Sequence, residues 1–276
     1  MTTILIPMAG LGTRFSQVGY KLLKSLISVS GKPMILNVIK DLPKANKWIF
    51  VMRQEHIDYG VDKIIKREIP NAIIIAIDKT TEGQACTCML AEKYLDLDDD
   101  LIIASCDIGF LYNKNKFDEL REKKDVDCIV LTFTKRETLR RNPNAWGWYI
   151  LEDDNETIKD ISIKVPVSNN SYNDHAVVGT FYFKKAKYFI DASNLMIKEN
   201  YRTNNEFYVD SIPKFLKKIG KKSIIFDVDL FVGWGKPDDL YDYERIEFII
   251  KNNVIPLDIN EEEKRLLPLW KKYFKK

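Results

Sequence analysis

Apolar runs of strand length alternate with segments of helical spacing through the first half of the chain. The strand-like runs lie at 3–8, 48–52, 72–77 and 101–104, and the helical segments at 33–39, 56–68 and 83–94. This β-α-β-α order predicts a largely parallel sheet with helices on both faces. Ligands of such sheets bind at the carboxyl ends of the strands. We therefore expect the chemistry to follow Met8 and Ala104, where two of these runs end.

The pattern changes after about Val126, where strand-like runs come closer together with less helix between them. These runs lie at 128–134, 146–151, 158–163 and 177–183, and a further one follows at 223–228. We expect them to add mixed or antiparallel strands beside the first sheet, as a smaller β-rich region over the substrate. Helices return at 187–198, 208–219 and 238–251, and the charged tail 260–276 is expected to form a terminal helix.

Composition and charge restrict the class of protein. The 276 residues suit one large α/β domain or two small ones. Lys and Arg total 43 against 40 Asp and Glu, and this balance argues against nucleic acid or a membrane as the main partner. The first residues lack a basic leader with an apolar core, and no apolar run approaches the roughly 20 residues of a membrane span. A cytoplasmic protein is expected. Its four cysteines lack zinc-site spacing, so we interpret them as small buried hydrophobes.

A glycine-containing segment follows the first strand and has the residues of an anion-binding loop. It reads Ala9-Gly10-Leu11-Gly12-Thr13-Arg14. Glycine lets successive backbone N–H groups face an anion, and the planar guanidinium of Arg14 suits phosphate oxygens. Lys24, a short distance downstream, adds a mobile point charge. The segment has neither the order of a P-loop nor the third glycine of a dinucleotide loop.

The N-terminal segment resembles the sugar nucleotidyltransferase family, also called nucleotide-sugar pyrophosphorylases. The resemblance lies in a strand followed by G-x-G-T-R, then the later lysine, and then Gly31-Lys32-Pro33. Bacterial surface-polysaccharide enzymes of this family are similar at Ile-Pro-Met-Ala-Gly and at a later Thr-Glu-Gly-x-Ala-Cys-Thr segment. The resemblance continues to about Tyr243. This chain departs from the family's proline-rich stretch, since Leu23, Ser25 and Ser28 stand where prolines are usual.

The resemblance implies an α/β fold with a Rossmann-like, mixed but mostly parallel sheet flanked by helices, of the nucleotidyltransferase or GT-A-like type, with a smaller sugar-binding β-rich region. It implies one nucleotidyltransferase domain at 1–255, with a nucleotide-binding part at 1–125 and a sugar-phosphate-binding part at 126–255. A C-terminal helical tail would follow at 256–276. The sequence leaves the oligomeric state open, since the apolar face of this tail suits either intramolecular docking or a homo-oligomer contact.

The implied reaction joins a nucleoside triphosphate to a sugar 1-phosphate and releases pyrophosphate, with Mg²⁺ as cofactor, in the synthesis of capsule or lipopolysaccharide precursors. The implied catalytic residues are Arg14, Lys24 and Asp107. The implied nucleotide-binding residues are Ala9, Gly10, Leu11, Gly12, Thr13, Asp78, Glu82 and Gly83. The implied substrate-binding residues are Gly147, Lys164, Gly179, Asn205 and Glu206.

Three aspartates carry the finer expectations. Asp107 follows a strand and, by the resemblance, is the metal aspartate, because Mg²⁺ binds few carboxylates together with phosphate oxygens. The family's second metal aspartate corresponds to Gly233 here, which leaves Asp229 as the candidate for the second metal ligand. Asp78 lies where relatives read the base. An ionised carboxylate only accepts hydrogen bonds, which favours uracil, thymine or guanine over cytosine.

Other interpretations stay open. Glu82 suits a helix cap, Lys164 a surface lysine and Asn205-Glu206 a turn before a helix. A cytidylyltransferase acting on a non-sugar alcohol phosphate would share the loop. A GT-A-type glycosyltransferase usually carries D-x-D, and Ser105-Cys106-Asp107 lacks the first Asp. A sensor that binds nucleotide sugars without catalysis is the third alternative.

Overall fold

The structure is a computed structural model that describes residues 1–275; Lys276, the last residue of the predicted tail, lies outside the described residues. The described chain divides into two compact units that are interleaved in the sequence. Unit 1 comprises Met1–Gly10, Lys44–Ser105 and Lys114–Asp227. Unit 2 comprises Leu11–Pro43, Cys106–Asn113 and the chain from Val228 onward. The predicted division at 125/126 stays a prediction.

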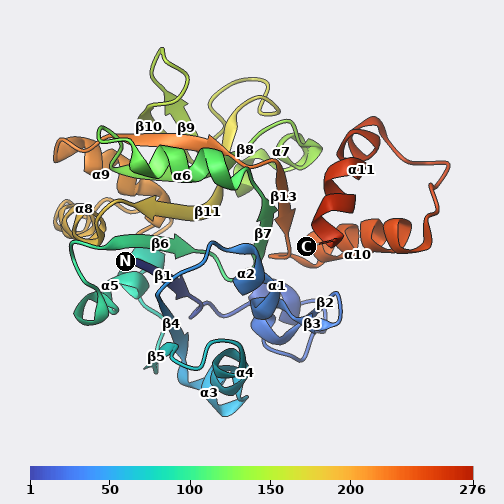
Figure 1. Ribbon diagram of the computed structural model, residues 1–276, viewed down its shortest axis with the longest axis horizontal. Helices are drawn as coiled ribbons and strands as arrows, with labels where there is room; N and C mark the ends of the chain where they lie inside the picture. The colour runs from blue at the N-terminus through green and yellow to red at the C-terminus, as the bar shows by residue number, and fades with distance from the viewer. Residues whose placement is uncertain (276) are drawn as a thin grey trace. The chain divides into compact units, whose positions relative to one another are not determined.

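The described residues of unit 1 form a nine-stranded sheet, with the order β10-β9-β11-β6-β1-β4-β5 and with β8 pairing both β11 and β12 (Figure 1). The strands are β1 (Thr2–Pro7), β4 (Lys47–Arg53), β5 (Ile73–Ile77), β6 (Asp100–Ala104), β8 (Cys128–Phe133), β9 (Gly147–Leu151), β10 (Ile158–Ile163), β11 (His175–Phe183) and β12 (Ser223–Asp227). Strands β6, β1, β4 and β5 are parallel neighbours, whereas β11 runs antiparallel to β6, β8 and β9. This mixed sheet flanked by helices confirms the predicted fold class.

Helices cover both faces of this sheet because side chains alternate along its strands. Phe181 and Phe183 of β11 join the main core, which α5, α8 and α9 also line. Tyr182 points to the other face, where Phe117 of α6 packs against it edge-on. The helices of unit 1 are α3 (Gln54–Asp58), α4 (Val61–Glu68), α5 (Gln84–Met89), η2 (Glu92–Tyr94), α6 (Lys114–Glu122), α7 (Glu137–Arg141), η3 (Pro143–Ala145), α8 (Ala186–Lys198), η4 (Val209–Ser211) and α9 (Ile212–Lys218).

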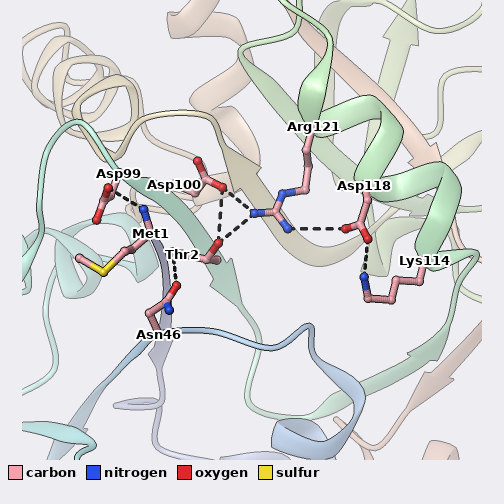
Figure 2. Close-up of polar contacts among 8 residues, drawn as sticks. All are labelled: Met1, Thr2, Asn46, Asp99, Asp100, Lys114, Asp118 and Arg121. Atoms are coloured by element: carbon pink, nitrogen blue, oxygen red, sulfur yellow. Dashed lines mark hydrogen bonds and ion pairs between the residues drawn. The ribbon is translucent and has the colours of Figure 1, made fainter.

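An ionic network fastens α6 to the amino ends of β1 and β6. Figure 2 shows the guanidinium of Arg121 donating to Asp100 Oδ2 at 2.5 Å and to Thr2 Oγ1 at 2.9 Å. Asp118, one turn earlier in α6, lies 3.7 Å from the same guanidinium. The N-terminal amine of Met1 is paired nearby with Asp99. These contacts fix the ends of the two strands whose opposite ends lead to the candidate site.

Unit 2 contains elements from three separate stretches of the sequence. They are α1 (Thr13–Ser16), η1 (Lys24–Leu26), β2 (Ser28–Val29), β3 (Lys32–Pro33), α2 (Met34–Asp41), β7 (Ile108–Leu111), β13 (Leu230–Gly233), α10 (Pro237–Asn252) and α11 (Glu261–Phe274). Strands β7 and β13 pair antiparallel, with Leu230 opposite Leu111 and Gly233 opposite Ile108.

The predicted terminal helix docks within unit 2. Asn260 caps α11 in a capping box with Glu263. Tyr243 of α10 makes an aromatic cluster with Trp270 and Tyr273 of α11, and the Tyr273 hydroxyl donates to Asp41 at 2.5 Å. The apolar face of the tail is therefore covered by its own chain, and we adopt intramolecular docking over a dimer contact for this face.

Three predicted helices are shorter than expected; the one at 208–219 forms as the 3₁₀ turn η4 followed by α9. The predicted helix at 56–68 forms as α3 and α4, because Gly60 between them has a left-handed φ of 75°. The predicted helix at 83–94 consists of α5 followed by the 3₁₀ turn η2. Among the described residues, no helix combines the length and apolar character that crossing a membrane requires.

Candidate active site

The loop after β1 is buried where it leaves the sheet and becomes exposed a few residues later. Met8 still donates to Val51 O at 2.8 Å, whereas Leu11 is 60% exposed. Gly12 adopts φ 66° at the N-cap of α1, and a Cβ there would lie 3.3 Å from Lys24 Cβ. Thr13 and Arg14 are exposed on α1, which Phe15 anchors in the core. The loop therefore presents Arg14 to solvent and passes directly over Lys24.

Lys24 and Asp107 form an ion pair in unit 2. Lys24 lies in η1 and Asp107 lies between β6 and β7 in the sequence, and Nζ donates to Oδ2 at 2.8 Å. Their side chains are 24% and 19% exposed. Burial alone would lower the pKa of Lys24, but Asp107 and the Cys106 thiol together raise it above its usual value, against opposition from Arg14. Lys24 is therefore a permanent cation at physiological pH.

The segment after β13 closes around Asp107. Trp234 donates its backbone N–H to Asp107 O at 2.9 Å, and a Cβ on Gly235 would lie 2.7 Å from Asp107 Oδ2. Asp239 lies in the first turn of α10, and the charge of Asp107 affects its pKa. Burial raises the pKa of Asp239 and Asp107 raises it further, while Lys236 lowers it. Asp239 is thus a second carboxylate near Asp107 that sequence reasoning missed.

The structure corrects the candidate Asp229. Its backbone N–H donates to Leu111 O, at the end of the β7–β13 pair opposite to Asp107. At about 3.4 Å per residue, four to five residue steps separate the two aspartates by on the order of 15 Å. Two carboxylates that bind one Mg²⁺ must both lie roughly 2 Å from it. Asp229 is therefore too far from Asp107 to share an ion with it.

In unit 1, Gly83 is fixed by a close approach of the chain. It has φ 131°, and a Cβ there would lie 2.5 Å from Phe207 N. Phe207 donates to Glu82 O at 2.8 Å and accepts from Ala85 N at 3.0 Å. The Glu82 side chain pairs with Arg202 at 3.2 Å and is 67% exposed. The backbone at 82–83 therefore packs directly against Phe207, in the segment that leads into η4, and the Glu82 side chain is directed to the surface.

Asp78, a further predicted nucleotide-binding residue of unit 1, and the predicted sugar-binding pair are exposed. Asp78 follows β5 at the carboxyl edge of the sheet. Asn205 has φ 64° and its carbonyl accepts from Arg202 at 3.1 Å. Glu206 closes a tight turn with Thr203 through two backbone hydrogen bonds of 3.0 Å. The turn interpretation of Asn205 and Glu206 therefore holds for their backbones, and their side chains remain exposed to solvent.

Two predicted substrate residues lie at one end of the β9–β10 pair. Gly147 is opposite Ile163 in the register, and Lys164, the next residue, donates its N–H to Trp146 O at 2.8 Å. Lys164 has φ 62°, an unfavourable conformation for a lysine. Its Nζ lies 5.8 Å from the centre of the Tyr208 ring. The half-buried Lys164 is thus held in a defined backbone conformation beside Gly147.

Gly179 lies on β11, where the register with β8 shifts. Its φ of 92° suits glycine, and its carbonyl accepts from the backbone and the hydroxyl of Ser105 at 2.9 and 3.2 Å. The structure therefore ties Gly179 to the end of β6, two residues before Asp107 in the sequence.

A further carboxylate that sequence reasoning missed stands against Gly147. A Cβ on Gly147 would lie 2.6 Å from Oδ2 of Asp210, a residue of η4. Burial raises the pKa of Asp210 to about 6. Unit 1 thus brings Gly147, Lys164 and Asp210 together, whereas unit 2 brings together Lys24, Asp107 and Asp239.

Comparisons with known proteins bear on the fold and the family resemblance. No family model matches the chain. The Bifunctional protein GlmU of Thermosipho melanesiensis is 24% identical over 243 residues, covering 87% of this chain and 49% of the relative. The chain spans about half the length of the curated relatives it matches.

Solved structures share the fold across most of both chains. A nucleoside-diphosphate-sugar pyrophosphorylase from Vibrio cholerae superposes with a TM-score of 0.71 at 18% identity, covering 88% of this chain and 99% of that one. An inositol-1-phosphate CTP transferase from T. maritima gives 0.67 at 17% identity, covering 93% and 98%. The resemblance predicted from the sequence motifs is confirmed: the chain has the nucleotidyltransferase fold and is similar to the nucleotide-sugar pyrophosphorylases.

Proposed function

We propose that this chain is a nucleotidyltransferase that joins a nucleoside triphosphate to a sugar 1-phosphate and releases pyrophosphate. The observation that carries the proposal is the pairing of Lys24 with Asp107 at 2.8 Å. It combines a permanent cation with a carboxylate directly after a parallel strand, beside an exposed G-x-G-T-R loop. Phosphoryl-type transfer needs positioning and charge neutralisation more than covalent help from the protein.

In the proposed reaction, an oxygen of the sugar phosphate attacks the α-phosphorus of the triphosphate in line, and the bond to the bridging oxygen of pyrophosphate breaks. The phosphate is already a competent nucleophile, so no general base is required. Arg14 and Lys24 stabilise the charge on the triphosphate and on departing pyrophosphate. Lys164 orients the attacking phosphate as a point charge.

The residues present suit Mg²⁺. The described residues contain no group of three or more protein ligands around one point. Mg²⁺ does not require one, because it usually binds one or two carboxylates and completes its shell with water and substrate phosphates. In this proposal Asp107 would supply the first carboxylate, and Asp239, whose pKa responds to the charge of Asp107, would supply the second. When bound, the ion would neutralise phosphate charge there.

The base and the biological role are the finer parts of the proposal. Asp78 is exposed after β5, and as a hydrogen-bond acceptor it favours a base with a ring N–H, such as uracil, thymine or guanine. A role in surface-polysaccharide precursor synthesis follows from the motif resemblance. An alcohol phosphate is the second candidate substrate, since the inositol-1-phosphate CTP transferase has the same fold.

The test is pyrophosphate release with Mg²⁺, with each of UTP, dTTP, GTP, CTP and ATP offered against sugar 1-phosphates, inositol 1-phosphate and phosphocholine. Release that needs both a triphosphate and a sugar 1-phosphate is expected, and it should fall at least a hundredfold in Lys24→Met. Lys21→Met is the matched control, because Lys21 is an exposed lysine of the same loop. Turnover with alcohol phosphates alone, or nucleotide binding without turnover, would overturn the proposal.

A further inference from the structure

Asp210 occupies a distinctive position in unit 1. Its backbone is fixed, because its carbonyl accepts a hydrogen bond of 2.9 Å from the hydroxyl of the buried Tyr149. Its carboxylate reaches Gly147, where a Cβ would lie 2.6 Å from Oδ2 and 3.2 Å from Val177. Any side chain at 147 would therefore collide with Asp210, and glycine keeps this carboxylate in place.

The same end of the β9–β10 pair carries Lys164. Gly147 is opposite Ile163, so Lys164 follows one residue further along the neighbouring strand. Tyr208, two residues before Asp210, lies under the Lys164 ammonium at 5.8 Å. A cation and an anion thus flank one glycine backbone, and both come from segments that the sequence motifs associate with the substrate.

The Asp210 carboxylate lacks a protein partner that would explain its burial. Among residues 1–275, the interaction that favours its charged form is with its own backbone N–H, and no side chain donates to it. A half-buried carboxylate whose one donor is its own backbone N–H leaves most of its hydrogen-bonding capacity unused, which is unfavourable. Such a group is retained most readily where a ligand supplies the missing donors.

We propose that Asp210 binds the transferred group of the phosphorylated substrate by accepting hydrogen bonds from its hydroxyls, so that this subsite selects a neutral sugar or polyol phosphate. The inference rests on the proposed function and names the substrate class for it. Hydroxyl donors fit better than a cationic head group, because the aromatic face nearest to Asp210 in the sequence, that of Tyr208, is already covered by the Lys164 ammonium. A second cation would be repelled there.

The experiment compares steady-state kinetics of wild type, Asp210→Asn and Asp210→Ala with the best sugar 1-phosphate and triphosphate. Asp210→Ala should raise the KM for the sugar phosphate at least about tenfold, since hydrogen bonds to a charged group are lost, and leave the KM for the triphosphate unchanged. Asp153→Asn, an exposed turn carboxylate in the same unit, is the matched control and should leave both constants unchanged.

A second readout separates substrate contact from support of the fold. Sugar 1-phosphates that lack one hydroxyl each are assayed with wild type and Asp210→Ala. If Asp210 accepts a hydrogen bond from one hydroxyl, removing that hydroxyl from the substrate should lower kcat/KM strongly for wild type. The same removal should lower kcat/KM much less for Asp210→Ala. Equal losses on both proteins, or a lowered melting temperature of Asp210→Ala with unchanged KM, would overturn the inference.

Wild-type turnover distinguishes the two proposals. If wild type turns over a sugar 1-phosphate but Asp210→Ala has the same KM for it, the Asp210 inference fails alone. If wild type releases pyrophosphate only with phosphocholine or another cationic alcohol phosphate, both proposals fail.

Discussion

The ion pair between Lys24 and Asp107 should contribute to stability and to catalysis by amounts that can be separated. Lys24→Met keeps most of the side-chain volume and removes the charge. Exposed ion pairs contribute about 0–1 kcal/mol, and breaking a fully buried pair costs about 3–5 kcal/mol. This pair lies between these limits, with side chains 24% and 19% exposed, so we expect Lys24→Met to reduce the free energy of unfolding by about 2 kcal/mol.

The catalytic effect should be larger. A group that stabilises developing charge in the transition state typically contributes a factor of about 10² to 10³ in kcat. Pyrophosphate release at saturating substrates measures this loss, and urea unfolding measures stability on the same preparations. Because Lys24 remains protonated across the working pH range, its contribution should not titrate between pH 6 and 9.

A double-mutant cycle with Asp107→Asn tests the pairing itself. If the two residues stabilise each other, the double variant should be more stable than the sum of the single effects predicts. Additive stability losses would refute the assigned ion pair. A Lys24→Met variant with near-normal kcat would refute the assigned catalytic role whatever its stability.

Four further outcomes follow from the geometry. Arg121→Met should lower the free energy of unfolding by about 2–3 kcal/mol in urea, because it leaves a partly buried carboxylate unpaired; a change below about 0.5 kcal/mol would contradict this. Gly83→Ala should cost about 2–4 kcal/mol in the same assay, since its Cβ would lie 2.5 Å from Phe207 N at φ 131°, and a stable variant would show that this approach is relaxed in solution. Burial raises the folded-state pKa of Asp210 to about 6. The protonated carboxyl therefore contributes stability below the unfolded pKa of about 3.9, and this contribution is lost as the pH rises through about 6. Asp210→Asn should remove this pH dependence from the melting temperature, and an unchanged pH profile would contradict the raised pKa. Asp239→Asn should raise the Mg²⁺ concentration needed for half-maximal activity and weaken Mn²⁺ binding measured by electron paramagnetic resonance, whereas unchanged Mn²⁺ affinity would remove Asp239 from the metal site.

The fold was readable from the sequence where burial leaves a simple pattern. Strand β1 is buried at every position, which produces the uninterrupted apolar run that predicts a parallel strand. The pair of β7 and β13 was not foreseen, because each strand has only four residues and their pairing joins segments more than 100 residues apart. The break between α3 and α4 was also not foreseen. Gly60 adopts a left-handed conformation there, but the apolar residues on both sides keep helical spacing and so predicted one continuous helix.

The candidate site could be predicted where a motif resembles a known family. Arg14 and Lys24 follow the first strand in a glycine-containing segment, the resemblance adds Asp107, and the structure pairs Lys24 with Asp107. Asp210 and Asp239 were missed because each lies at a helix start, where an acidic residue is expected for the helix alone. Their relation to Gly147 and Asp107 depends on tertiary contacts that no local spacing encodes.

The two units suggest a division of chemical roles. Unit 2 carries the permanent charges, Lys24 and Arg14, together with Asp107, which are the groups a reaction at phosphorus requires. Unit 1 carries Asp78, Gly147 and Lys164, which the sequence associates with the base and the sugar phosphate. If this division holds, substitutions in unit 2 should act mainly on kcat and those in unit 1 mainly on KM.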